Sequence, residues 1–201
     1  MSRWLGQERD AAAVDRILDA AGTVFASSGI ASTGMGDIAK AAGCSRATLY
    51  RYFKDRHALR RAFVHRAARE IARRVAREIT EVRDPTHRFV EAVTGTLTAV
   101  RSDPVLRAWF SGGDSTIATE LAHESEVISA IGAAFLSRDG SDLDRDLLLR
   151  ARWTVRVVVS LLASPEPDPG DERALVARFL APVVLEVTAT GPDAAASVVP
   201  G

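Results

Sequence analysis

Cysteine is nearly absent from this sequence: Cys44 is the only one in 201 residues. A single thiol excludes an internal disulfide and a cysteine-based metal cluster. The four histidines are scattered along the chain rather than spaced as ligands on one helix face. The sequence also lacks a glycine-rich phosphate loop and a nucleophile elbow. We therefore expect no metal, no cofactor and no catalytic residues.

Long hydrophobic runs are also missing. The run from Val157 to Ala163, interrupted only by Ser160, is too short to cross a bilayer and follows Arg152 and Arg156. The first residues include Glu8 and Asp10 and contain no apolar segment typical of a signal peptide. These absences predict a cytoplasmic protein without a membrane partner.

The sequence has no net charge, but its charges are unevenly distributed. Up to Arg83 there are 16 Lys and Arg against 9 Asp and Glu, whereas the remainder has 10 against 17. A basic first part suggests a surface that faces nucleic acid. The alternative is a chance distribution of solvated charges on a helical protein.

Apolar residues recur at three- and four-residue spacing along most of the chain, which predicts an all-α protein of about nine helices. Residues 1–54 are expected to form a three-helix DNA-binding domain with a helix-turn-helix. Its first helix would span about 14–28 and end at Gly29, and its second would span 35–42 and end at Gly43. The recognition helix would span 45–52, with Ser45 as its N-cap.

The remaining helices divide into a connector and a second domain. A long connecting helix is predicted over 55–84, with one apolar stripe and an arginine-rich face that we interpret mostly as solvated. Asp84-Pro85 breaks the pattern, so a ligand-binding and dimerisation domain is expected over 85–190. In it, one helix would run from Ile117 to Phe135 and the last from Ala174 to Val187. Residues 191–201 read as a disordered tail.

The turn between the second and third helices has the residue types that a tight helix crossing needs. Ala39 is small enough for two helices to touch, and Gly43 tolerates a left-handed turn. Ile38, Leu49 and Cys44 would fill a small core between the helices. We interpret Cys44 as an apolar filler, with a redox role as the alternative.

The start of the third helix suits DNA, because the N-terminal residues of a recognition helix approach base edges. Arg46 can donate two hydrogen bonds to guanine, and Thr48 can contact a base edge or a thymine methyl. The alternatives are phosphate contact for Arg46 and packing against the fourth helix for the two tyrosines. Together the predicted DNA contacts are Thr33, Ser45, Arg46, Ala47, Thr48, Tyr50, Arg51, Tyr52 and Lys54.

The segment from Gly29 to Leu59, with Ile38-Ala39, Gly43-Cys44-Ser45 and Leu49-Tyr50-Arg51-Tyr52-Phe53 at its centre, resembles the signature of the TetR family of regulators. With the first helix, the resemblance covers roughly residues 14–65. It implies a dimeric, all-helical repressor in which a small ligand moves the fourth helix and thereby the DNA-binding heads. Gly34 and Gly36 depart from the family's usual pattern.

The family layout implies a dimer through the last two helices, and their sequences hold more apolar residues than one core needs. The candidates are Val157, Leu161, Leu175, Phe179 and Val183, which would otherwise be internal core. Ligand cavities are mainly apolar, so a second set is predicted to line an effector site. This set, in which each residue alternatively belongs to the core, is Phe89, Val93, Leu97, Trp109, Phe110, Leu121, Phe135, Trp153 and Arg156.

The sequence therefore predicts a transcriptional regulator whose partners are double-stranded DNA, a small-molecule effector and a second copy of the chain. A DNA-binding architectural protein without ligand is one alternative, although the apolar second domain is larger than a dimer contact requires. A helical small-molecule enzyme is the other, and no motif supports it.

Overall fold

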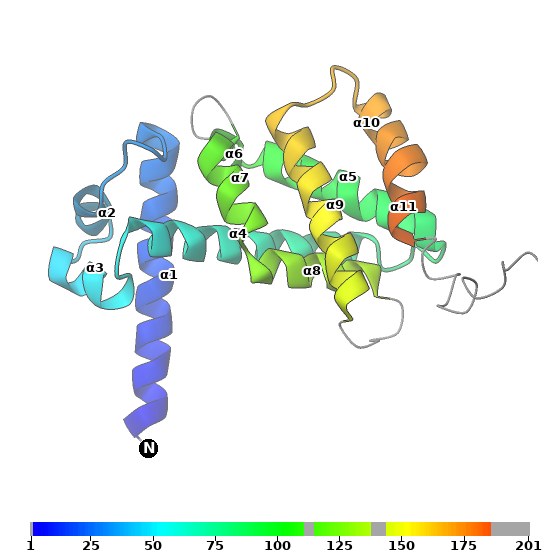
Figure 1. Ribbon diagram of the computed structural model, residues 1–201. Helices are drawn as coiled ribbons and strands as arrows, with labels where there is room; N and C mark the ends of the chain where they lie inside the picture. Colours follow the sequence, from blue (N-terminus) through cyan, green and yellow to red (C-terminus); the bar gives the residue numbers. More distant parts are fainter. Residues whose placement is uncertain (1, 111–114, 138–143, 186–201) are drawn as a thin grey trace, which may run out of the picture. The chain divides into compact units, whose positions relative to one another are not determined.

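The computed structural model describes residues 2–110, 115–137 and 144–185, with side chains from Arg9 onward except that of Ser115. Every regular element in these ranges is helical, as predicted (Figure 1). The described residues form two compact units. The first holds the residues up to Ile71 and those from Ala99 to Ser125, and the second holds Ala72 to Thr98 and the residues from Glu126 on. The predicted loop at 111–114 and the tail at 191–201 lie outside the described residues.

The first unit begins with three helices that form the predicted helix-turn-helix domain: α1 (Ser2–Ser28), α2 (Met35–Ala41) and α3 (Arg46–Tyr52). Gly29, with φ of 79°, ends α1 and donates its N–H to the Phe25 carbonyl at 3.0 Å. The first helix starts earlier than the predicted residue 14. The apolar repeat begins at Val14 because only the following turns are packed, whereas residues 9–12 are exposed.

The core of the first unit is built around three aromatic rings. Phe25 of α1 makes edge contacts with Phe63 and Trp109, at centroid distances of 5.4 Å each. Phe63 belongs to α4 (Arg56–Glu78), and its ring is stacked parallel to Trp109 at 5.6 Å. Trp109 ends α6 (Pro104–Trp109), which packs on α1, and α7 (Ser115–His123) adds Ala118 and Leu121 to the same core. The unit therefore joins segments distant in sequence.

The second unit contains the greater part of α5 (Pro85–Ser102), followed by α8 (Glu126–Leu136) and α9 (Arg145–Ala163). Aspartates cap two of these helices: His87 donates its N–H to Asp84 at 2.7 Å, and Leu147 donates to Asp144 at 2.6 Å. α8 packs closely on α9. A methyl group built on Gly132 of α8 would be 3.4 Å from the side chain of Ala151 in α9, which is van der Waals contact.

The chain ends its described part in α10 (Pro169–Leu175), a π-helical turn η2 (Val176–Leu180) and α11 (Ala181–Leu185). Sequence analysis predicted one uninterrupted helix here. Pro182 explains the irregularity, since it cannot donate to the carbonyl four residues earlier and its ring crowds that carbonyl. A wider π turn just before the proline accommodates both effects.

Two other predicted helices also differ in length. α4 ends at Glu78 rather than near Arg83, and the Thr80 hydroxyl donates back to the Ala76 carbonyl at 2.8 Å. The helix predicted from Ile117 to Phe135 is two helices, α7 and α8, separated at Glu124 and Ser125. Ser125 is buried, and its hydroxyl lies 2.9 Å from Nε2 of His65. Burial, helped by Arg69 and Arg61, lowers the pKa of His65 and favours the neutral ring.

The boundaries between the two units fall within α4 and within α5 rather than at Asp84-Pro85. The reason lies in α6 and α7, which follow α5 in sequence but share the core of α1. Contacts therefore do not follow the order of the chain. The division into residues 1–54, 55–84 and 85–190 was based on sequence pattern alone and stays a functional prediction.

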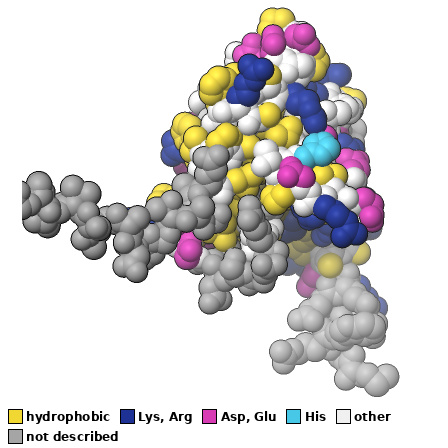
Figure 2. Space-filling view, turned by 90° about the vertical axis from the view of Figure 1, so that its right-hand side faces the viewer, with side chains coloured by type: hydrophobic (Ala, Val, Ile, Leu, Met, Phe, Trp, Pro, Cys, Tyr) yellow, Lys and Arg dark blue, Asp and Glu magenta, His cyan; other side chains and the backbone are white. Residues whose placement is uncertain are grey.

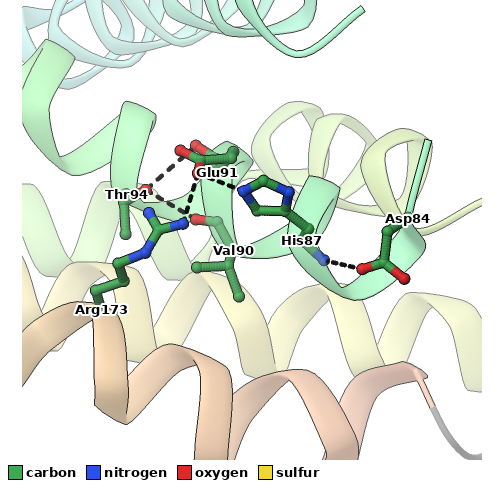
Figure 3. A network of polar contacts seen from close by, with 6 residues as sticks. All are labelled: Asp84, His87, Val90, Glu91, Thr94 and Arg173. Carbon is green, nitrogen blue, oxygen red and sulfur yellow. Dashed lines mark hydrogen bonds and ion pairs between the residues drawn. The ribbon is translucent and has the colours of Figure 1, made fainter. Parts of the chain in front are cut away.

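Glu91 links α5 to α10 within the second unit (Figure 3). Its carboxylate accepts from Nη2 of Arg173 in α10 at 2.5 Å and lies 2.9 Å from Nε2 of His87. The hydrogen bond from Arg173 is the main cause that lowers the pKa of Glu91, and the same bond raises the pKa of Arg173. Because both side chains are partly exposed, solvent screens most of this attraction.

We predict that Trp109→Ala destabilises the protein by about 3–5 kcal/mol, because it leaves a cavity beside Phe25 and Phe63. Urea unfolding followed by circular dichroism measures this loss. Tyr50→Ala is the matched control, since Tyr50 is 50% exposed and its removal should change stability by less than about 0.5 kcal/mol. Equal effects of the two substitutions would contradict the packing described above.

We predict that Glu91→Gln lowers the free energy of unfolding by about 0.5 kcal/mol at neutral pH and low salt. The folded-state pKa of Glu91 is lowered, so its contribution is present above the ordinary glutamate pKa and is lost as pH falls through the folded value. Unfolding curves at several pH values measure this dependence. In a cycle with Arg173→Gln the losses should not add, and additivity would show that the pair does not interact.

Candidate nucleic-acid interface

The helix-turn-helix is closed by a short left-handed turn between α2 and α3. Gly43 has a φ of 66°, which a side chain would resist. On either side of it, the Ala42 N–H donates to Ile38 at 2.8 Å and the Cys44 N–H donates to Ala39 at 3.0 Å. These bonds satisfy the end of α2 and redirect the chain into α3. The predicted turn residue is therefore confirmed by the geometry.

A small apolar core fixes α3 against its neighbours. Ile38 and Leu49 are fully buried, and Ala39 is 2% exposed. They belong to one cluster with Ile17, Leu18 and Phe25 of α1, so the helix pair shares its core with α1 (Figure 1). Cys44 is half-buried against the same cluster. Its position agrees with the interpretation as an apolar filler.

Ser45 caps α3, as predicted. Its hydroxyl accepts from the Thr48 N–H at 3.0 Å, and the two hydroxyls lie 2.9 Å apart. The helix proper starts at Arg46. The Thr48 side chain is half-buried and engaged with the cap, which leaves its methyl group for other contacts.

The outer surface of α3 is exposed. Arg46, Ala47, Tyr50 and Arg51 are exposed, and Lys54, just beyond the helix, lies only near Asp55 at 3.9 Å. Half of the Tyr50 side chain is accessible to a partner. A helix anchored by one buried leucine therefore presents several cationic and polar side chains together.

Tyr52 has a partner that sequence reasoning missed. Its hydroxyl donates to Oδ1 of Asp10 in α1 at 2.9 Å and accepts from Nη2 of Arg51 at the same distance. The Arg51 guanidinium also lies 4.9 Å from the centre of the Tyr52 ring. The Tyr52 hydroxyl proton is thus already donated within the protein, to Asp10. No sequence signal linked the two residues, since Asp10 lies outside the apolar repeat.

The prediction that the Thr33 hydroxyl meets a phosphate is contradicted. Thr33 is 1% exposed, and its hydroxyl donates to the Gly29 carbonyl at 2.6 Å. Arg56 also holds this loop, since it donates to the Ala31 carbonyl at 3.0 Å, and the buried Arg60 donates to Ile30. Arginines at the start of α4 therefore fix the loop between α1 and α2.

The predicted effector residues divide between the two units. Phe89, Val93 and Leu97 are buried in α5, and Phe135 is half-buried in α8. By contrast, Trp109, Phe110 and Leu121 belong to the core of the first unit. Trp153 is 50% exposed, and Arg156 is exposed rather than facing inward. The structure does not bring the whole set together.

The predicted dimer residues also differ in how exposed their side chains are. Phe179 and Val183 are 67% and 55% exposed, which excludes the alternative that they are internal core of the chain. Val157 and Leu175 are half-buried, and Leu161 is buried. Leu149, which the sequence analysis did not select, is 52% exposed. Figure 2 shows hydrophobic side chains gathered on one face, bordered by charged ones.

Among the described residues, no group of three or more His, Cys, Asp or Glu side chains could hold a metal ion. No helix in the described ranges is long and apolar enough to cross a bilayer.

Comparisons with known proteins agree with this geometry. Residues 17–63 match the family model of bacterial regulatory proteins of the tetR family. The chain is 48% identical over 186 residues to the uncharacterized HTH-type transcriptional regulator Rv1255c of Mycobacterium tuberculosis, covering 92% of each protein.

Solved structures share the fold. The TetR family repressor AlkX from Dietzia sp. strain DQ12-45-1b, implicated in biodegradation of n-alkanes, is 26% identical with a TM-score of 0.65, over 86% of this chain and 97% of that one. RolR in complex with resorcinol is 18% identical with a TM-score of 0.62, over 90% and 89%. Rv1255c and AlkX are described as transcriptional regulators rather than enzymes, and the chain belongs to the TetR family of DNA-binding transcriptional regulators.

Proposed function

We propose that this regulator is a homodimeric repressor that binds a palindromic operator and is released by a small, mainly apolar effector. The observation that carries the proposal is the placement of α3: Leu49 is fully buried, while Arg46, Ala47 and Tyr50 are exposed on one short helix. A recognition helix that is anchored on one side and polar on the other suits the major groove. Chromosomal DNA as partner implies a cytoplasmic location.

The exposed side chains divide into two DNA-binding roles. Arg46, at the start of α3, reads a base edge, with Ala47 and Thr48 beside it. Tyr50, Arg51 and Lys54 contact backbone phosphates, which fix the position of the helix on the duplex. Ser45 acts as the cap that orients them, and Tyr52 supports Arg51 through its hydroxyl. The excess of basic residues up to Arg83 supports this assignment.

The second unit supplies the proposed dimer contact. Leu149 and Trp153 are four residues apart on α9, and Phe179 and Val183 are four apart in η2 and α11, so each pair lies on one helix face. Arg150 donates to the Val184 carbonyl at 3.1 Å and ties the two segments together. Large apolar side chains at this exposure are stabilised by a second copy, which would bury them in a four-helix contact.

The effector would bind in the second unit, within the region 85–190. Phe89, Val93 and Leu97 supply an apolar face of α5 for it, and Phe135 is a further candidate. The implication of AlkX in n-alkane biodegradation favours linear hydrocarbon chemistry as the first class to test. α4 carries residues of both units, so a shift of this helix would transmit binding to the DNA-binding domain.

The experiment is a fluorescence anisotropy titration of the full-length protein on duplex DNA from upstream of its own coding region. We expect binding to a palindromic site whose affinity falls steeply with salt, because phosphate contacts release counterions. Light scattering should give twice the chain mass, and Phe179→Glu should give a monomer that binds DNA at least tenfold more weakly. Addition of n-alkanes, alkanols or fatty acids then tests release.

Three outcomes contradict parts of the proposal. Absence of salt-sensitive binding to any palindromic site in that DNA would contradict operator recognition. A monomeric wild-type protein would contradict the dimer surface. Binding that no apolar compound releases would favour the architectural alternative.

We predict that Asp10→Asn and Asp10→Ala each raise affinity for all duplexes by about threefold at low salt, because both remove a negative charge beside Arg51 and Tyr52. The gain should shrink at high salt, where charges are screened. Asparagine keeps an acceptor for the Tyr52 hydroxyl and alanine does not. Weaker binding of Asp10→Ala alone would instead show that the hydrogen bond positions Tyr52 for DNA.

A further inference from the structure

Gly36, the second residue of α2, lies directly beneath the side chain of Arg46 in α3. A methyl group built on Gly36 would be 2.5 Å from Nη2 of Arg46 and 3.0 Å from both Cζ and Nε. Distances below 3.0 Å do not occur for real Cβ atoms, so no other residue at 36 permits this placement. The guanidinium therefore occupies the space that a side chain at position 36 would take.

The other glycines of the helix-turn-helix have different reasons to be glycine. Gly43 is required for its positive φ, and a methyl group there would meet nothing within 4 Å. Gly34 precedes α2, and a methyl group on it would approach only Oδ2 of Asp37, at 3.1 Å. Gly36 has no positive φ, so its backbone suits any residue. Its structural effect is the room it leaves for Arg46.

This contact matters because no hydrogen bond or ion pair with another described residue fixes the Arg46 side chain. It is exposed, and a free arginine side chain has many rotamers. Two hydrogen bonds to one guanine require the guanidinium plane to have a defined direction. The α2 backbone at Gly36 limits the directions available before DNA is bound.

We propose that Gly36 is a specificity-determining residue, because it seats the Arg46 guanidinium on α2 and thereby sets which base edge Arg46 reads. The inference rests on the proposed function, in which Arg46 contacts bases. A larger residue at 36 would push the guanidinium away from α2 without unfolding the domain, since the displaced atoms are the end of a flexible side chain.

The test is a selection from a random-sequence duplex DNA library, run in parallel with full-length wild type, Gly36→Ala, Arg46→Ala and the double variant. Competition titrations then measure relative affinities for the selected sites. We expect Arg46→Ala to lose base preference at one position of each half-site. Gly36→Ala should change relative affinities by about fivefold or more at that same position. The double variant should match Arg46→Ala.

Two controls separate this effect from a general change in the domain. Gly34→Ala places the same methyl group in the same segment without touching Arg46, so its base preferences should equal those of the wild type. Gly36→Ala should melt no lower than the wild type, because alanine favours a helix more than glycine does. In the DNA-free protein, nuclear Overhauser effects between the Gly36 Hα and Arg46 side-chain protons should be present.

The outcomes distinguish this inference from the proposed function. If the wild type selects a site but Gly36→Ala selects the same site with unchanged relative affinities, the role of Gly36 is refuted and operator recognition stands. An equal change in the Arg46→Ala background refutes it as well, because the effect would not pass through Arg46. If the wild type selects no site, operator recognition itself fails, and the specificity role of Gly36 fails with it.

Discussion

The burial of Leu49 is the contact on which the rest of the DNA-binding domain depends. α3 has only seven residues, and a helix of that length is not stable alone in water. Leu49 joins it to the buried cluster that also holds Ile38 of α2 and Ile17 and Leu18 of α1. The left-handed turn at Gly43 makes this packing possible, since it lets α2 and α3 cross within a few residues. Every exposed residue of α3 gains its position from that anchor.

The same domain is held from its other side by arginines of α4. Arg56 and Arg60 donate to carbonyls of the loop between α1 and α2, and Arg66 lies 2.9 Å from Asp19 of α1. These bonds use groups that a loop would otherwise leave to water. They also join α4 to α1 and to the loop that follows it. A change in α4 would therefore reach α1 and the loop before α2 together.

Sequence pattern predicted the helix-turn-helix closely because its constraints are local. Ser45, Gly43 and Leu49 each have a residue type that one short-range structure requires, and all three lie as expected. Contacts between segments distant in sequence could not be predicted from such local patterns. The repeat that contains Trp109 is the same whether the ring lines a cavity or stacks on Phe63, and only the fold decides between them. Thr33 is polar but buried, because its hydroxyl caps the end of α1 instead of facing solvent.

The structure distinguishes buried from exposed apolar residues that follow the same helical repeat in the sequence. Leu161 and Phe179 both satisfy a helical repeat, yet Leu161 is 8% exposed and Phe179 is 67% exposed. The hydrophobic repeat records only that a helix face is removed from water in the functional state. Where a single chain leaves part of that face exposed, a second chain is the simplest source of the missing contact.

Gly36 illustrates the opposite relation between local preference and function. Glycine in a helix costs up to about 1 kcal/mol relative to alanine, and the backbone at this position does not demand it. Residues that violate a local preference without a structural need are concentrated at functional sites. Here the cost coincides with direct contact to Arg46, the first residue of the recognition helix. The departure from helix preference and the placement of the Arg46 guanidinium thus have one physical explanation, the absence of a Cβ atom at residue 36.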